Sequence, residues 1–251
     1  MSKKTITVGF AGLKGGCGKS TLAISFASYL AYVLDLKVVA VDADDYQKSL
    51  FYQRDRDIKA LADPSQIKLQ KKFVRQEKEI FEVHNSGSVQ APKLIQDLRN
   101  TEGYDVIIVD TGGKIDQAAS LILYAEIDFI IIPFEAEAKS LDANSKFLAL
   151  LKETVLRKAN SRLQEVFIFW NKMRPNEKKE IFVQAYQALY QAGYKIFDNL
   201  MEYKKSYQEE EVSQSTILPL QGSTAQSNMA KLMVEITNTL NIKANKQKSV
   251  A

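Results

Sequence analysis

The sequence predicts an α/β fold in which helices flank a doubly wound, mostly parallel sheet. Three observations lead to this prediction: short apolar runs alternate with helical segments, two of the runs end in an acid, and a glycine-rich loop joins the first run to the first helix. The first expected strand is 5–11, and an apolar helical run occupies 22–27. A strand, a glycine-rich loop and a helix in this order form the setting of a phosphate-binding loop.

The later expected strands are compact apolar runs, as in parallel strands that are buried on both faces. They occupy residues 37–42, 104–110, 128–133 and 165–171, with helical segments at 92–100, 115–125 and 141–159. Strands that alternate with helices favour a parallel sheet with crossover connections. Ligands of such sheets bind at the carboxyl ends of the strands, so Asp42, Asp110 and the glycine-rich loop are expected to share one edge.

The composition fits one folded domain spanning residues 1–251. Hydrophobic residues make up 45% of the chain and charged residues 25%, which is ordinary for a globular protein with a sizeable core. The formal net charge of +4 permits a nucleic-acid partner without requiring one. Cys17 is the single cysteine and is interpreted as a packing residue, so no internal disulfide is expected. With no apolar run long enough to cross a membrane, these features predict a cytoplasmic protein.

Two regions lack the regular alternation. Residues 48–78 mix basic and acidic side chains, which predicts one or two solvated surface helices broken near Pro64. From Ile242 onward the sequence has lysines but no apolar periodicity, so we expect a frayed tail over residues 242–251.

The glycine-rich loop carries the clearest chemistry. Its residues are Lys14, Gly15, Gly16, Cys17, Gly18, Lys19, Ser20 and Thr21. Glycines let successive backbone N–H groups point at phosphate oxygens, and the following helix adds its positive N-terminal dipole. Lys19 is expected to neutralise the β- and γ-phosphates of a bound nucleotide, and the Ser20 hydroxyl to ligate Mg²⁺.

This loop resembles the deviant Walker A box of the ParA/MinD family of ATPases. Leu13 replaces the first glycine of an ordinary phosphate-binding loop, and Lys14 precedes the glycine pair. The resemblance covers most of the chain and is strongest over 5–47 and 104–117. It implies an ATP- and Mg²⁺-dependent ATPase that forms a homodimer, in which Lys14 reaches nucleotide bound by the second subunit and assists hydrolysis. The alternative is that Lys14 is a surface lysine beside the site.

The acids at the strand ends extend the resemblance. Asp110, followed by Thr111-Gly112-Gly113, is a Walker B arrangement, and we expect Ser20, Asp110 and Asp42 to serve the magnesium shell. Asp42, Asp44 and Gln47 match an Asp-x-Asp-x-x-Gln switch segment, in which Asp44 would position or activate the attacking water. Relatives often carry proline where this chain has Asp45, and the plasmid-partition branch commonly has arginine at the position of Lys114.

Asn171 follows the last apolar strand, where the family places an asparagine that contacts the base. The guanine-reading pattern Asn-Lys-x-Asp requires an acid at its last position, but Arg174 supplies only hydrogen-bond donors. Adenine is therefore the expected base.

The ParA branch predicts a DNA-segregating ATPase. Such a protein binds nonspecific DNA as an ATP dimer, associates with the nucleoid in that state, and is released when a ParB-like partner stimulates hydrolysis, so that plasmid or other DNA is segregated. Lys204 and Lys205 match the late ParA stretch that contacts DNA, with Lys172 and Arg174 as further candidates. Their contacts would be to phosphates and carry no sequence information.

The alternative function is a MinD-like or cargo-positioning ATPase that acts on a membrane or a protein scaffold. An apolar stripe with helical spacing, from Met229 to Leu240, is compatible with a membrane-targeting helix. A helix of this kind is more often docked on the core of its own domain, so membrane association is the less favoured reading.

Overall fold

The structure is a computed structural model, and it describes residues 4–101, 103–113, 117–174, 179–203, 215–218 and 224–244. Within these residues one parallel sheet has the strand order β3-β2-β4-β1-β5-β6-β7. The strands are β1 (Ile6–Phe10), β2 (Val38–Ala43), β3 (Glu82–Asn85), β4 (Val106–Thr111), β5 (Phe129–Phe134), β6 (Glu165–Trp170) and β7 (Lys195–Ile196). The predicted doubly wound α/β architecture is confirmed.

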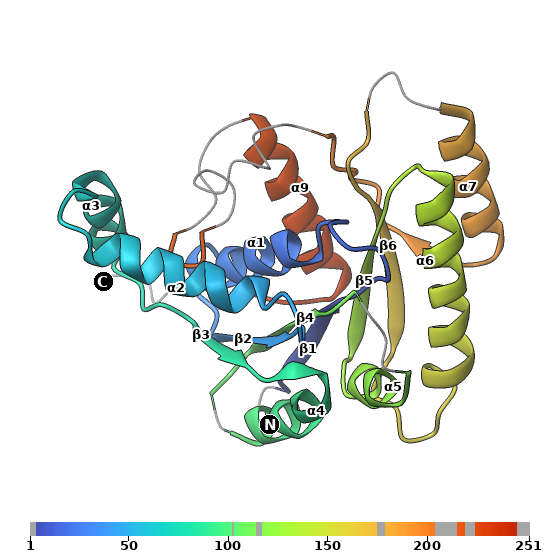
Figure 1. The fold of residues 1–251 in the computed structure, drawn as a ribbon, viewed down its shortest axis with the longest axis horizontal. Helices are drawn as coiled ribbons and strands as arrows, with labels where there is room; N and C mark the ends of the chain where they lie inside the picture. Colours follow the sequence, from blue (N-terminus) through green and yellow to red (C-terminus); the bar gives the residue numbers. More distant parts are fainter. Residues whose placement is uncertain are drawn as a thin grey trace.

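Helices cover both faces of the sheet (Figure 1). They are α1 (Lys19–Tyr32), α2 (Ser49–Ala62), α3 (Ile67–Gln76), α4 (Gly87–Asn100), α5 (Gln117–Ala125), α6 (Ala138–Leu150) with a π-helical turn (Leu151–Val155), α7 (Lys179–Gln191) and α9 (Thr224–Thr239). Alternate strand residues divide between two cores: Val38 and Ala40 pack with α1 and α9, whereas Val39 and Val41 pack with α4, α5 and α6. This period of two explains why the strands are apolar throughout.

Helix α9 lies beside α1 (Figure 1), and its apolar stripe is buried. The side chains of Met229, Leu232, Met233, Ile236 and Leu240 are at most 3% exposed and belong to the core that contains Phe26. The stripe therefore packs against the core of its own domain, as a docked helix does. No helix in the described part of the chain is both long enough and apolar enough to cross a membrane.

Several details go beyond the sequence prediction or correct it. The segment 48–78 forms α2 and α3 with a break at Pro64, as expected. The short edge strands β3 and β7 and the helix α7 were not predicted. Ile242 is not frayed: its backbone N–H donates to the Thr237 carbonyl (3.0 Å) and its side chain is buried. Residues 245–251 lie outside the described residues.

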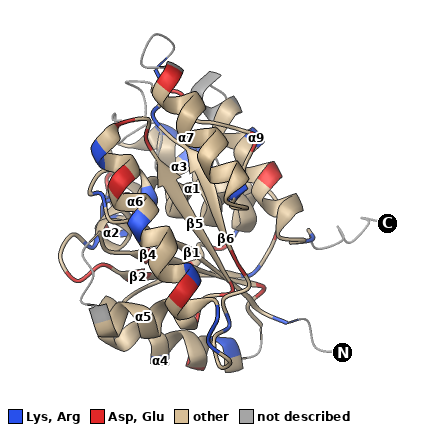
Figure 2. Cartoon of the chain, turned by 90° about the vertical axis from the view of Figure 1, so that its right-hand side faces the viewer, with Lys and Arg blue, Asp and Glu red and all other residues tan. Residues whose placement is uncertain are grey.

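Charged side chains on the outer helices mostly alternate in sign. Along α6 basic and acidic positions follow one another (Figure 2), and Lys146 pairs with Asp142 one turn away (2.8 Å). Pairs of this kind keep a helix surface soluble and contribute little to stability.

Candidate nucleotide and magnesium site

The glycine-rich loop joins β1 to α1 at the carboxyl edge of the sheet. Two of its glycines have left-handed backbone conformations, Gly16 (φ 70°) and Gly18 (φ 100°), which other residues rarely adopt. A Cβ at Gly18 would also collide with the side-chain amide of Asn171. Helix α1 begins at Lys19 without a side-chain cap, and the positive end of its dipole lies at the loop, where it favours an anion.

Lys19 lies within the curl of the loop. Its side chain is buried, and its ammonium donates to the backbone carbonyl of Lys14 (3.4 Å). Gly113, just past β4, comes so close that a Cβ there would lie 3.4 Å from the same ammonium. This position between the loop and the end of β4 is suited to phosphate neutralisation.

Asp110 has the features expected of a residue in a metal shell. It is 1% exposed, and neither carboxylate oxygen has a hydrogen-bond partner among the described residues. Burial, followed by the nearby charge of Asp42, raises the pKa of Asp110 to about 8, whereas Ser20 and Lys19 lower it. An unpaired buried carboxylate is costly, and a cation would relieve that cost. The residues present therefore fit a magnesium ion, which would also need nucleotide phosphates because no cluster of three or more His, Cys, Asp or Glu ligands occurs in the described chain.

The other two acids of the edge are engaged with the backbone. Asp42 accepts from the N–H groups of Asp44 (3.1 Å) and Phe51 (2.9 Å), and burial raises its pKa. Asp44 accepts from the N–H groups of Tyr46 (2.9 Å) and Gln47 (3.0 Å). A Cβ on Gly112 would lie 3.3 Å from the Asp44 carboxylate, so the switch segment after β2 packs against the segment after β4. Asp42 is thus placed to shape this segment, and the Asp110 carboxylate is the one left available to a cation.

Asp45, where relatives often have proline, links the switch segment to α4. Its carboxylate accepts from the N–H (2.9 Å) and the hydroxyl (2.6 Å) of Ser88, in the first turn of α4. The negative charge lies at the positive end of that helix, which stabilises the contact. A movement of the switch segment would therefore be coupled to α4.

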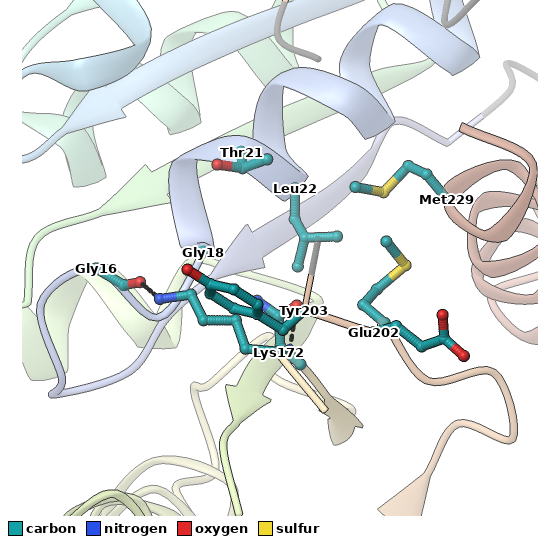
Figure 3. A pocket seen from close by; sticks show the side chains of 10 residues that line it. Gly16, Gly18, Thr21, Leu22, Lys172, Glu202, Tyr203 and Met229 are labelled. Carbon is teal, nitrogen blue, oxygen red and sulfur yellow. Dashed lines mark hydrogen bonds between the residues drawn. The ribbon is translucent and has the colours of Figure 1, made fainter. Parts of the chain in front are cut away.

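A pocket of about 230 Å³ opens beside the loop (Figure 3). It is lined by Gly16, Gly18, Thr21, Leu22, Asn171, Lys172, Met201, Glu202, Tyr203 and Met229. The Asn171 amide donates to the Cys17 carbonyl (2.7 Å) and its oxygen accepts from the N–H of Lys172 (2.9 Å). The mixture of thioethers, an aromatic ring and a few polar groups suits a nucleoside. Cys17 is fully buried, and burial raises the pKa of its thiol, consistent with a packing role.

Lys14 points away from the curl of its own loop. Its ammonium contacts the carboxylates of Glu135, just after β5, and of Glu137 (2.7 Å). Burial alone would lower the pKa of Lys14, but the two carboxylates raise it overall. Lys172 joins the cluster, with its ammonium 3.1 Å from Glu135 and in contact with the Gly16 carbonyl (Figure 3). These groups line a second pocket of about 290 Å³.

Comparison with known proteins agrees with this geometry. A model of the CobQ/CobB/MinD/ParA nucleotide binding domain matches residues 8–217. The chain belongs to this family. A relative from Gloeobacter kilaueensis, named maintenance of carboxysome distribution protein A, is 26% identical over 212 residues, covering 84% of this chain and 83% of the relative.

Solved structures of other ParA/MinD-family proteins share the fold. A ParA family ATPase from Chlorobium tepidum superposes with a TM-score of 0.66 at 20% identity, covering 92% of this chain and 99% of that one. An ATP complex of a Cyanothece McdA variant has a TM-score of 0.66 at 16% identity, covering 98% and 100%. At these identities the likeness concerns the fold alone.

In this ParA/MinD-family member, the sequence did not indicate Glu135, Glu137 or the pocket residues Met201, Glu202, Tyr203 and Met229. The signal for Glu135 was available: it follows β5, so it lies at the same sheet edge as Asp42 and Asp110. Met201, Tyr203 and Met229 gave no signal because only the fold brings them to the loop.

Two of the four DNA-contact candidates, Lys172 and Arg174, lie in the described residues, and both line the pocket that contains Lys14. The Lys172 ammonium lies at the nucleotide pocket, and the Arg174 guanidinium stacks over the Tyr203 ring (4.3 Å to its centroid). Lys204 and Lys205 lie outside the described residues, as does Lys114.

Proposed function

We propose that this chain is an ATPase that positions a cargo by cycling between a nucleotide-free state and an ATP-bound homodimer. In the ATP-bound state the dimer associates with nonspecific DNA, and hence with the nucleoid. A partner protein attached to the cargo stimulates hydrolysis and releases the dimer. Ser20 and Asp110 would hold a magnesium ion, which would supply positive charge against the phosphates.

The observation that carries the proposal is the position of Lys14. Lys19 lies within the loop, whereas the Lys14 ammonium is turned outward to Glu135 and Glu137. A lysine in this position does not serve the phosphates of its own loop. It is suited to enter the site of a second subunit, where an added cation stabilises the transferring phosphoryl group.

Within its own site, each proposed residue has one task. Backbone N–H groups from Gly15 to Thr21 and the Lys19 ammonium bind phosphate. Asp44 orients the attacking water at the sheet edge, and Asn171 lies beside the base.

The cargo that we propose follows from the name of a relative. The relative from Gloeobacter kilaueensis is named for the distribution of carboxysomes. This name supports a cargo-positioning role with an adaptor protein attached to the cargo as the partner. Plasmid partition with a ParB-like adaptor is the second candidate, favoured by the resemblance of the segment from Asp110 to Asp116 to the partition branch.

Substitution of Lys14 tests the proposal. Lys14→Ala is expected to bind ATP within a few-fold of the native affinity and to lose dimerisation on ATP. Its turnover is expected to fall by at least about 100-fold, given the 10³–10⁵-fold contribution of comparable trans-acting cations. Lys19→Ala is the matched control and is expected to lose ATP binding itself. A Lys14→Ala protein that still forms the ATP dimer, measured by sedimentation, and still hydrolyses ATP at the native rate would refute the proposal.

A further inference from the structure

Helix α3 is the one helix of the described chain for which no residue is buried. It lies with α2 at one end of the molecule, away from α5, α6 and α7 (Figure 1). A helix that buries nothing contributes little to the core, so its sequence is free to serve another purpose.

All four basic residues of α3 lie on one face. They are Lys68, Lys71, Lys72 and Arg75, with spacings of three, four and seven residues that confine them to an arc of roughly 100°. All four side chains are exposed, and α3 contains no acidic residue. We call this set the α3 basic face.

The opposite side of α3 is attached to the protein. The Gln70 amide donates to the carbonyls of Leu61 (3.1 Å) and Asp63 (2.9 Å), and the Gln76 amide donates to that of Ile217 (2.7 Å). These hydrogen bonds hold α3 in one orientation. Lys71 and Arg75 lie on the side of the helix away from them by helical spacing, whereas Lys68 and Lys72 border a pocket that α2 lines with Asp57.

The α3 basic face is electrostatically unlike the other helix surfaces. One lysine on each of α2, α4 and α6 pairs with an acid one turn away: Lys59 with Asp55 (2.6 Å), Lys93 with Asp97 (2.7 Å) and Lys146 with Asp142 (2.8 Å). The four cations of the α3 basic face form no ion pair with any residue that the structure describes. Like charges three and four residues apart destabilise a helix slightly, and an external polyanion removes that cost.

We propose that the α3 basic face is a binding surface for the phosphate backbone of duplex DNA. This inference rests on the proposed function and assigns the DNA contact to a different part of the chain from Lys204 and Lys205. Exposed cations in a row recognise phosphates without reading sequence. An ATP-dependent homodimer presents the face twice, which couples DNA affinity to nucleotide state.

The apolar residues of α3 favour DNA over a lipid surface. A helix that lies in a membrane needs a wide, free apolar face. In α3 the Leu69 and Phe73 side chains are half-buried, on the same side as the attaching glutamines, and only Ile67 and Val74 are exposed apolar positions. Two aliphatic side chains at one margin of a basic face do not make such a surface.

A pair of charge-matched variants tests the inference. The first combines Lys68→Gln, Lys71→Gln and Lys72→Gln; the control combines Lys59→Gln, Lys93→Gln and Lys146→Gln. Glutamine retains helix propensity, and both variants lose the same charge. The full chain, with Mg²⁺ and a non-hydrolysable ATP analogue, is titrated into fluorescein-labelled random-sequence duplex DNA at several salt concentrations.

The first variant is expected to bind at least about 10-fold more weakly and to show a salt slope smaller by about 2.7 per subunit, since each phosphate contact contributes about 0.9. The control is expected to keep the native slope, and basal ATP hydrolysis is expected to be unchanged in both. Replacing the same three lysines by arginine is expected to retain DNA binding.

The outcomes separate this inference from the proposed function. If the native chain binds DNA only with ATP and the first variant binds equally well, the assignment to α3 is wrong and the proposed function stands. If the native chain shows no ATP-dependent DNA binding at any salt concentration, the DNA role itself is wrong. If the first variant keeps DNA binding but loses native binding to phosphatidylglycerol vesicles, the face is a membrane surface and the inference is overturned.

Discussion

The Lys14 ammonium lies 2.7 Å from the Glu137 carboxylate of its own chain and also contacts Glu135. The residue proposed to serve a second subunit is therefore held by acids at the end of β5. An intramolecular ion pair of this kind must break before Lys14 can reach another molecule, and so it opposes dimerisation.

Removal of the exposed half of this pair is expected to favour the dimer. Glu137 is 63% exposed, so Glu137→Gln leaves no buried charge without a partner. An exposed ion pair contributes about 0.2–1 kcal/mol, and because a dimer breaks two of them, the dissociation constant is expected to fall by about 2- to 30-fold. Sedimentation with a non-hydrolysable ATP analogue measures this constant.

The matched control is Asp142→Asn, which removes an equally exposed carboxylate from its lysine on the neighbouring α6. The control is expected to dimerise like the native chain. A Glu137→Gln protein with an unchanged or weaker dimer would show that the contact does not restrain Lys14.

Two glycines of the loop are expected to differ in their response to alanine. At Gly18, both the left-handed φ of 100° and the collision with the Asn171 amide oppose a Cβ. Gly18→Ala is expected to lower the free energy of unfolding by roughly 1–3 kcal/mol. At Gly15 no atom lies within 4 Å of the added Cβ, so Gly15→Ala in the nucleotide-free protein is expected to be neutral or slightly stabilising.

Urea unfolding without nucleotide measures both changes. Combining Gly18→Ala with Asn171→Ala removes the collision but not the backbone strain. Gly18→Ala is therefore expected to cost less free energy of unfolding in the Asn171→Ala background than in the native chain, but still to be destabilising. Equal effects at Gly15 and Gly18 would contradict this description of the loop.

The sequence was sufficient for the parts of the fold that follow from local pattern. The runs that became β1, β2, β4, β5 and β6 are apolar because helices cover both of their faces. Edge strands lack that cover. Strand β3 reads Glu82-Val83-His84-Asn85, with no buried residue, so its pattern does not differ from a polar loop.

The candidate site likewise has one part that the sequence predicted and one part that it did not. The glycine-rich loop and Asp110 lie in contiguous motifs. Both follow parallel strands, and the carboxyl ends of such strands share one edge of the sheet, so the sequence predicted that they lie together. The contact of Lys14 with Glu135 joins residues 121 positions apart, and the half-exposed Lys172 meets the same carboxylate from β6. Contacts of this range depend on strand order, which the sequence pattern did not specify.

Asp110 is expected to make the nucleotide-free protein less stable as the pH rises. Its pKa of about 8 in the folded chain lies above its ordinary value of 3.8. Between these values the folded chain holds a proton that the unfolded chain has released, so the free energy of unfolding falls with increasing pH. Asp110→Asn has no such group, and its advantage over the native chain is expected to grow between about pH 4 and about pH 8, to on the order of a few kcal/mol.

Urea unfolding of both proteins without nucleotide, at about pH 5 and about pH 8, measures this difference, with Asp142→Asn as the exposed control. With ATP and Mg²⁺ present, the native chain is expected to be the more stable of the two proteins. Bound ATP and Mg²⁺ raise its free energy of unfolding, whereas Asp110→Asn gains much less because a carboxylate ligand is missing. A stability difference that is independent of pH would show that Asp110 is not held as a protonated, unpartnered acid. A variant stabilised by Mg²⁺ and ATP as fully as the native chain would remove Asp110 from the magnesium shell.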